Sequence, residues 1–217
     1  RSEGLTPGQK MAGQLVVTAV FAYYMAKISD VGLTLKVPFF PNISLNPGWL
    51  SIPLLFFVVI GTVNGTNFTD GLDGLAASVT VMVAVFFSVV ALGTNAGIAP
   101  ITLAVVGGLL GFLLFNVYPA SVFMGDTGSL ALGGFVASTA YMMNMPLFLL
   151  LVGIIYLVEV LSVMIQVTYF KVTHGKRFFK MAPIHHHFEK CGWSETRVVT
   201  VFSIITALCC LVALAGI

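Results

Sequence analysis

Long apolar segments constrain this chain more than any other feature of its sequence. Most of them reach the roughly 20 residues that a helix needs to cross a bilayer. Only 8% of the 217 residues are charged, whereas a soluble domain carries about 25%. The sequence therefore predicts an all-α integral membrane protein. Seven transmembrane helices are expected, at about residues 11–27, 48–63, 72–93, 98–117, 128–144, 147–170 and 196–217.

The segment between the first two predicted helices has a different pattern. Apolar residues at positions 33, 35, 37 and 39 alternate with Thr34, Lys36 and Pro38. Alternation with a period of two is typical of a strand with one covered face. We therefore expect a small β-hairpin outside the membrane within residues 31–44.

The distribution of Lys and Arg predicts the orientation in the membrane. If the first residues are cytoplasmic, seven crossings leave only Lys27 and Lys36 outside. The other basic residues then lie inside: Arg1, Lys10, Lys171, Lys176, Arg177, Lys180, Lys190 and Arg197. This bias follows the positive-inside rule. It places three polar stretches on one face: residues 64–73, 116–129 and 171–197. We expect an active site there, open to the cytoplasm.

The first polar stretch reads NGTNFTDGLDGLA. It spaces two amides and two carboxylates three residues apart, at Asn64, Asn67, Asp70 and Asp73. On a helical turn, this spacing puts side chains near one face. The chain has only eight acidic residues, and two of them stand here at the edge of a membrane span. A hard cation together with a phosphorylated substrate explains this arrangement best.

Asp126 is the main candidate in the second stretch. At the start of a helix it would cap backbone N–H groups in the simplest interpretation. Alternatively, it meets Asp70 and Asp73 at one point, where three carboxylates would raise one another's pKa unless a cation joined them. Mg²⁺ usually takes one or two protein carboxylates and keeps several waters. We therefore expect Asp126 alone as a direct ligand.

Two further residues of this stretch have open interpretations. Phe123 stands next to Asp126 in a polar loop, where its ring would either stack on a base or anchor the loop in the membrane. Asn116 is either a polar contact within the helix bundle or an amide of the site. The sequence leaves both pairs of alternatives open.

The third stretch contains His185, His186 and His187 in succession. Three consecutive residues of a regular helix point in different directions, so they cannot all ligate one ion. Zinc is therefore disfavoured, and hydrogen bonding to a phosphate or sugar is favoured. Upstream, Glu159 lies within an apolar segment, where it either serves function or joins helices through hydrogen bonds. The net charge of +2 gives no indication of a nucleic-acid partner.

Three motifs together resemble one enzyme family. NGTNFTDGLDGLA, FMGDTGSLALGG and MAPIHHHFEKCGWSE are similar to the signatures of the phospho-N-acetylmuramoyl-pentapeptide transferases, which are polyprenyl-phosphate N-acetylhexosamine-1-phosphate transferases. The resemblance implies a multi-pass enzyme of ten helices in the bacterial inner membrane, with its active site on the cytoplasmic face. It implies Mg²⁺-dependent transfer of phospho-MurNAc-pentapeptide from UDP-MurNAc-pentapeptide to undecaprenyl phosphate. The products are lipid I, used in peptidoglycan synthesis, and UMP.

The resemblance also implies roles for single residues. Asp126 matches the metal aspartate, and Phe123 and Asp73 match contacts to uracil. The catalytic group is expected to comprise Asp126, Asp70, His185, His186 and His187. Contacts to the nucleotide and substrate are expected from Asn67, Asp70, Gly71, Asp73, Asn116 and Phe123.

One feature of the family has no match in this sequence. The family has an adjacent aspartate pair at the cytoplasmic end of an earlier helix, and no Asp-Asp pair occurs in the 217 residues. We therefore expect residues 1–217 to form one membrane transferase domain that lacks three N-terminal helices. Whether the reaction is direct or passes through a covalent intermediate stays open. The oligomeric state also stays open, with a homodimer among the alternatives.

Two other functions compete with this hypothesis. One is a sister transferase that uses UDP-GlcNAc, against which the run HHHFE argues. The other is a transporter, which would place charges at mid-membrane along a path open to both sides.

Overall fold

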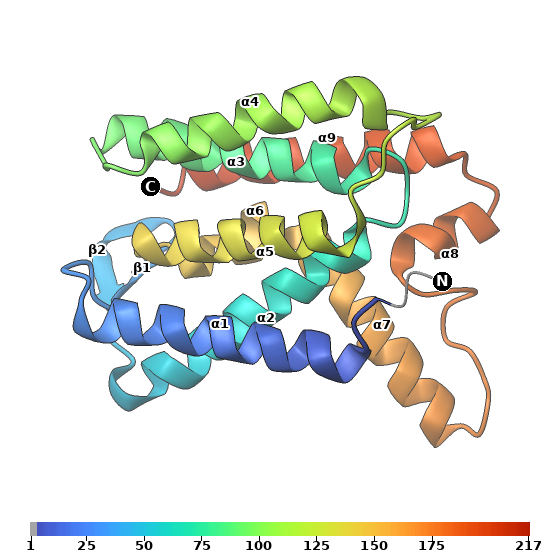
Figure 1. The fold of residues 1–217 in the computed structure, drawn as a ribbon, viewed down its shortest axis with the longest axis horizontal. Coiled ribbons are helices and arrows are strands. Elements are labelled where there is room, and N and C mark those ends of the chain that lie inside the picture. Colours follow the sequence, from blue (N-terminus) through green and yellow to red (C-terminus); the bar gives the residue numbers. More distant parts are fainter. Residues whose placement is uncertain (1–3) are drawn as a thin grey trace.

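Helices dominate residues 4–217, the part of the chain that the structure, a computed structural model, describes (Figure 1). Most of the long helices lie alongside one another, and α7 slants away from them. The helices are α1 (Pro7–Lys27), α2 (Ser51–Thr69), α3 (Leu75–Gly93), α4 (Ala99–Asn116), α5 (Gly125–Met142), α6 (Leu149–Val152), α7 (Ile154–Val172), α8 (Ile184–Lys190) and α9 (Glu195–Leu214). The strands are β1 (Leu35–Val37) and β2 (Phe40–Leu45).

Five helical segments in the described part of the chain are long and apolar enough to cross a membrane. They are Gly48–Thr69, Leu75–Gly93, Ala99–Asn116, Ile154–Val172 and Glu195–Leu214. They coincide with five of the seven predicted segments, so the expected count of seven is not confirmed. The remaining two segments form α1 and α5, helices of 21 and 18 residues. Each of these begins with a polar turn, PGQKMAGQ in α1 and GDTGS in α5, which lowers its overall hydropathy.

The most enclosed of the five spans is α3. Of its most apolar 18-residue window, 72% is buried, against 22–28% for the other four spans. Its neighbours include α4, α5 and α9. Phe86 and Phe87 of α3 are buried with Phe148, and the Phe86 and Phe148 rings stack with centroids 6.2 Å apart. The other spans expose apolar side chains such as Leu114 and Leu211, as expected of helices that face lipid.

Two glycines allow α2 to approach its neighbours closely. A Cβ added at Gly133 of α5 would lie 2.5 Å from Val63 Cα, and one at Gly65 of α2 would lie 2.6 Å from the Tyr156 carbonyl oxygen. Small residues at such positions let membrane helices pack backbone against backbone. By contrast, a Cβ at Gly134 would meet nothing within 4 Å. Helix α2 is thereby held between α5 and α7.

The predicted hairpin is confirmed. β1 pairs with β2 in an antiparallel two-stranded sheet, with Leu35 opposite Leu45 and Lys36 opposite Ser44. Leu35 is buried, and the Lys36 N–H donates to the Asn144 carbonyl oxygen at 2.7 Å. This contact fixes the hairpin against the chain that follows α5.

The hairpin and the polar stretches lie at opposite ends of the bundle (Figure 1). The loop between α2 and α3, the loop between α4 and α5, and the segment that contains α8 gather at the end away from the hairpin. The expected convergence of the three polar stretches is therefore present. Arg1 lies outside the described residues.

Candidate active site

Asn67 joins α2 to α5 at the polar end. Its Nδ2 donates to Asp126 Oδ1 at 3.0 Å and to Ser129 Oγ at 2.8 Å. Lys10 of α1 forms an ion pair with Asp126 Oδ2. Three helices that are distant in sequence therefore meet at one carboxylate. The Lys10 ammonium, followed by the Asn67 amide, lowers the pKa of the Asp126 carboxyl.

The structure does not support the capping interpretation of Asp126. Asp126 lies in the first turn of α5, and the N-cap position of this helix is Met124. Among the described residues, the Asp126 carboxylate accepts from the side chains of Asn67 and Lys10 and from no backbone N–H. The carboxylate therefore contacts side chains of two other helices and does not cap its own. The sequence-based prediction counted Lys10 only for topology, since no local pattern indicates a contact 116 residues away.

Asp70 directly follows α2 and is partly buried. Burial, and then the charge of nearby Asp126, raise the pKa of Asp70 to about 6. The two carboxylates thus influence each other at the same end of the molecule. A bound cation would relieve this repulsion.

The expected meeting of Asp70, Asp73 and Asp126 at one point is wrong. Within residues 4–217, no three His, Cys, Asp or Glu side chains are close enough to hold one metal ion. Asp73 turns instead to the next loop, where its Oδ2 accepts from the Ala120 N–H at 2.8 Å. The reason is the turn after Thr69, which ends the helical spacing on which the prediction depended.

Asn64 also leaves the predicted row. Its Nδ2 donates to Gln14 Oε1 at 2.7 Å and to the Ile60 carbonyl oxygen at 2.8 Å. Asn64 therefore joins α2 to α1, one turn before Asn67. Its contacts are with α1 and with its own helix, away from Asp126.

Asn116 and Glu195 hold the loop between α2 and α3. The Gly74 N–H donates to Asn116 Oδ1 at 3.1 Å, and Asn116 Nδ2 donates to the Val122 carbonyl oxygen at 2.8 Å. The Asp73 N–H donates to Glu195 Oε1 at 2.7 Å. The Asn116 side chain is 4% exposed. Both its oxygen and its nitrogen form hydrogen bonds that join loops. The sequence-based prediction missed Glu195, whose only signal is its place at the start of α9.

Phe123 is 74% exposed in the loop between α4 and α5. Its ring is therefore free to stack on a base or to enter the membrane interface.

The three histidines of α8 have three different surroundings. His185 is fully buried, and its Nδ1 lies 3.0 Å from Glu159 Oε1. His186 Nδ1 lies 2.5 Å from Glu189 Oε2, and His187 Nδ1 accepts from the Lys180 N–H at 3.1 Å. The rings thus have separate partners in the protein. The sequence-based site omitted Glu159, whose only signal was a carboxylate within an apolar helix.

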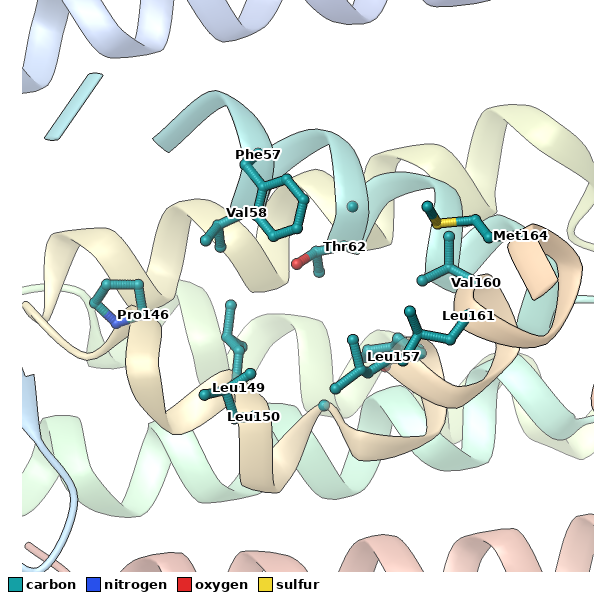
Figure 2. Close-up of a pocket in the computed structure, with 13 residues that line it drawn as sticks. Phe57, Val58, Thr62, Pro146, Leu149, Leu150, Leu157, Val160, Leu161 and Met164 are labelled. Atoms are coloured by element: carbon teal, nitrogen blue, oxygen red, sulfur yellow. The ribbon is translucent and has the colours of Figure 1, made fainter. Parts of the chain in front are cut away.

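An apolar pocket lies between α2, α6 and α7 (Figure 2). It has a volume of about 180 Å³. Phe57 and Val58 of α2 face Leu157 and Leu161 of α7 across it. Because Phe57 is 76% exposed, the pocket is accessible from the outer surface of the bundle.

Comparison with known proteins identifies the family of this helical protein, whose acidic and amide side chains gather at one end. Residues 3–144 match the model of glycosyl transferase family 4. The whole chain is 52% identical to a phospho-N-acetylmuramoyl-pentapeptide-transferase of Clostridium perfringens strain 13, over 217 residues and 67% of that relative. It is 53% identical to the protein of that name from Acetivibrio thermocellus, over 97% of this chain and 64% of the relative.

A third relative, from Clostridium beijerinckii, is 50% identical over 96% of this chain and 64% of its own length. The chain therefore belongs to glycosyl transferase family 4 and, within it, to the phospho-N-acetylmuramoyl-pentapeptide-transferases. It spans about two thirds of the length of these curated relatives.

Proposed function

We propose that this protein transfers phospho-MurNAc-pentapeptide from UDP-MurNAc-pentapeptide to undecaprenyl phosphate, giving lipid I and UMP. The names of relatives about 52% identical over the whole chain support this function. The structural observation that carries it is the junction of Asn67 and Asp126 beside Asp70. This junction places acidic and amide groups at the end of a membrane helix bundle, where a water-soluble nucleotide and a lipid phosphate can meet.

The overall reaction exchanges one phosphoanhydride bond for another. An oxygen of the lipid phosphate becomes bonded to the phosphorus that carries the sugar, and the bond from that phosphorus to UMP breaks. Both reactants are anions, so the barrier arises from their repulsion and from charge that develops on UMP. Positioning and electrostatic stabilisation are therefore the expected contributions of the protein.

The donor set at the polar end suits Mg²⁺. Asp126 and Asp70 offer hard carboxylate oxygens, and the raised pKa of Asp70 reflects negative charge that a cation would offset. Asp126 would hold the ion, with the substrate diphosphate and waters as further ligands. When bound, Mg²⁺ stabilises negative charge on the diphosphate. Asn67 and Lys10 orient the Asp126 carboxylate.

The other site residues are proposed to contact the uracil, the ribose, the diphosphate and the sugar phosphate of the substrate, or to position the loops around it. Phe123 stacks on uracil with its exposed ring, and Asp73 orients the loop that faces the nucleotide. Asn67, Asp70 and Gly71 line the ribose and diphosphate. His185, His186 and His187 lie near the sugar phosphate.

The apolar pocket is proposed to receive part of the polyprenyl chain. It is bordered by Phe57, Leu157 and Met164 and is accessible at the surface of α2 and α7. A lipid could enter there sideways from the bilayer. Its phosphate would then lie at the polar end of the same helices.

The polar end is proposed to face the cytoplasm, across the inner membrane of a bacterium. The basic residues support this orientation. Lys27 ends α1 and Lys36 lies in β1, at the hairpin end. Lys10 pairs with Asp126 at the polar end. The segment from Lys171 to Arg197, which contains α8, lies at the same end.

One assay separates this function from its two rivals. Membranes that carry the full-length protein are incubated with undecaprenyl phosphate, Mg²⁺ and one UDP-sugar, and UMP and lipid products are measured. We expect turnover with UDP-MurNAc-pentapeptide and none with UDP-GlcNAc. The reverse preference would establish the sister activity, and UMP release with neither would favour a transporter. Loss of turnover on chelation of Mg²⁺ would support the metal assignment.

A further inference from the structure

Glu159 and His185 form a fully buried acid–imidazole pair. Each side chain is 0% exposed, and Glu159 Oε1 lies 3.0 Å from His185 Nδ1. The other carboxylate oxygen, Oε2, accepts from the Ile184 N–H at 3.0 Å. One carboxylate of α7 therefore holds two successive residues at the start of α8.

This pairing determines which ring nitrogen of His185 is available to the site. A carboxylate only accepts hydrogen bonds, so Nδ1 must carry a proton toward Glu159. The second nitrogen, Nε2, is buried and has no partner among the described residues. Buried polar atoms usually have a partner, so an unpartnered nitrogen beside a proposed active site indicates a missing ligand.

Nε2 points at the segment that follows Asp70. A Cβ added at Gly71 would collide with Nε2, and it would lie 2.7 Å from Cε1 of the same ring. Glycine is therefore required at position 71 because the imidazole edge lies against its backbone. The free nitrogen thus stands next to the loop on which the diphosphate contacts are proposed.

The neighbouring histidines lack this arrangement. His186 pairs with Glu189 three residues further along the same helix, and both side chains are partly exposed. His187 uses its Nδ1 to accept from the Lys180 backbone. Within residues 4–217, His185 is the one ring of the three that is held by a buried carboxylate from another helix. This difference separates its role from theirs.

We propose that Glu159 is a positioning residue for the transfer reaction: it keeps the proton on Nδ1 of His185 and so presents Nε2 to an oxygen of the bound sugar phosphate beside Gly71. The proposal depends on the proposed function for its substrate. The contacts of Glu159 and the free nitrogen do not depend on it. Glu159 itself touches no substrate and acts through His185.

The first test measures the imidazole directly in the wild-type, full-length protein. The protein is labelled with ¹⁵N-histidine, and the His185 signals are assigned by their loss in His185→Gln. We expect a protonated Nδ1, and an Nε2 signal that shifts when UDP-MurNAc-pentapeptide is added without lipid acceptor. An unprotonated Nδ1, or an Nε2 signal that does not respond to this substrate, would overturn the proposal. This measurement requires no variant of Glu159 to fold and no turnover.

The second test uses Glu159→Gln. Glutamine replaces one of the two carboxylate oxygens with an NH2 donor, so this group faces either the Ile184 N–H or the Nδ1–H of His185 and cannot accept from it. Loss of the partners that orient metal-ligating side chains typically costs about 10- to 100-fold in activity, and we take the same range for a carboxylate that orients His185. We expect kcat to fall by about that factor while KM for the UDP-sugar changes little. The Nδ1 signal of His185 should lose its fixed protonation at the same time.

Thr80→Val serves as the matched control. It removes another buried hydrogen bond to α7, between Thr80 Oγ1 and Tyr156 OH at 2.7 Å, at a position outside the proposed site. We expect wild-type kcat in this variant. Wild-type kcat in Glu159→Gln, or an equal loss in Thr80→Val, would contradict a positioning role. If the wild-type protein releases no UMP at all, the proposed function fails, whereas the ¹⁵N result still tests the pair.

Discussion

Asn67 and Asp126 are 59 residues apart in sequence, yet Asn67 Nδ2 donates to Asp126 Oδ1 at 3.0 Å. The contact joins the last turn of α2 to the first turn of α5. The glycine contact between Gly133 and Val63 lies deeper along the same two helices. The close packing of α2 against α5 thereby sets the relative position of the Asn67 and Asp126 side chains at the polar end.

Asp126→Asn should abolish turnover while the protein stays folded. Asparagine keeps nearly the same shape but removes the charge that pairs with Lys10 and that would bind Mg²⁺. Removal of a single oxyanion-hole donor typically lowers kcat by about 10²- to 10³-fold, and we expect a loss at least as large for a carboxylate that holds the metal ion. UMP release at limiting Mg²⁺, together with thermal unfolding, checks this expectation.

The control for this charge is Asp30→Asn. Asp30 is an exposed acid that follows α1, close to the hairpin end. It should keep full activity. Normal turnover of Asp126→Asn at limiting Mg²⁺ would refute the metal role.

Phe123→Ala should weaken nucleotide binding and leave stability unchanged. The ring is 74% exposed, so its removal leaves no cavity. Stacking of a base on an aromatic ring is worth about 1–3 kcal/mol at nucleic-acid sites, and we expect a loss of that order in affinity for UMP. Phe40→Ala, which removes a ring 57% exposed in the hairpin, is the control. Equal UMP affinity in all three proteins would remove Phe123 from the site.

Asn116→Leu should lower stability as well as activity. The substitution leaves the Gly74 N–H and the Val122 carbonyl oxygen without their partner. An unsatisfied buried group costs about 1–3 kcal/mol. The unfolding temperature in detergent should therefore fall. The rise in unfolding temperature on addition of UMP should also be smaller than in the wild type. An unchanged unfolding temperature would show that these loops do not depend on Asn116.

Local patterns predicted the helices and the hairpin because period and hydropathy are properties of neighbouring residues. The same is true of the three polar stretches, which gather at one end of the bundle. The pairing of Lys10 with Asp126, and that of Glu159 with His185, link residues that are 116 and 26 positions apart. Such contacts depend on how the helices pack against one another. Local patterns in a single sequence do not predict that packing. Asn64 is an example of the opposite error. Its even spacing predicted that it would lie in a row with Asn67, Asp70 and Asp73, but its side chain packs against Gln14 of α1 instead.

Gly133→Ala should destabilise the bundle. The new Cβ would lie 2.5 Å from Val63 Cα and 3.0 Å from the Thr62 carbonyl oxygen, so α2 and α5 would have to separate. Overpacking of this kind typically costs about 1–3 kcal/mol. The neighbouring Gly134→Ala, whose Cβ meets nothing within 4 Å, is a matched control. Equal unfolding temperatures in the two variants would contradict the close contact of α2 with α5.

Gly61→Leu tests the proposed place of the polyprenyl chain. Gly61 lines the apolar pocket, and a Cβ there meets nothing within 4 Å, so a leucine would fill space without displacing the backbone. If the lipid occupies this pocket, KM for undecaprenyl phosphate should rise by about tenfold, a loss of ~1.4 kcal/mol, while KM for UDP-MurNAc-pentapeptide stays the same.

Gly107→Leu is the control for added apolar bulk on a helix. Gly107 lies in α4, and a Cβ there likewise meets nothing within 4 Å, but it does not line the pocket. We expect both KM values of this variant to equal those of the wild type. If Gly61→Leu also keeps the wild-type KM for undecaprenyl phosphate, the acceptor lipid does not use this pocket. If KM for the UDP-sugar rises as well, the substitution has disturbed the polar end through α2 rather than blocked a lipid.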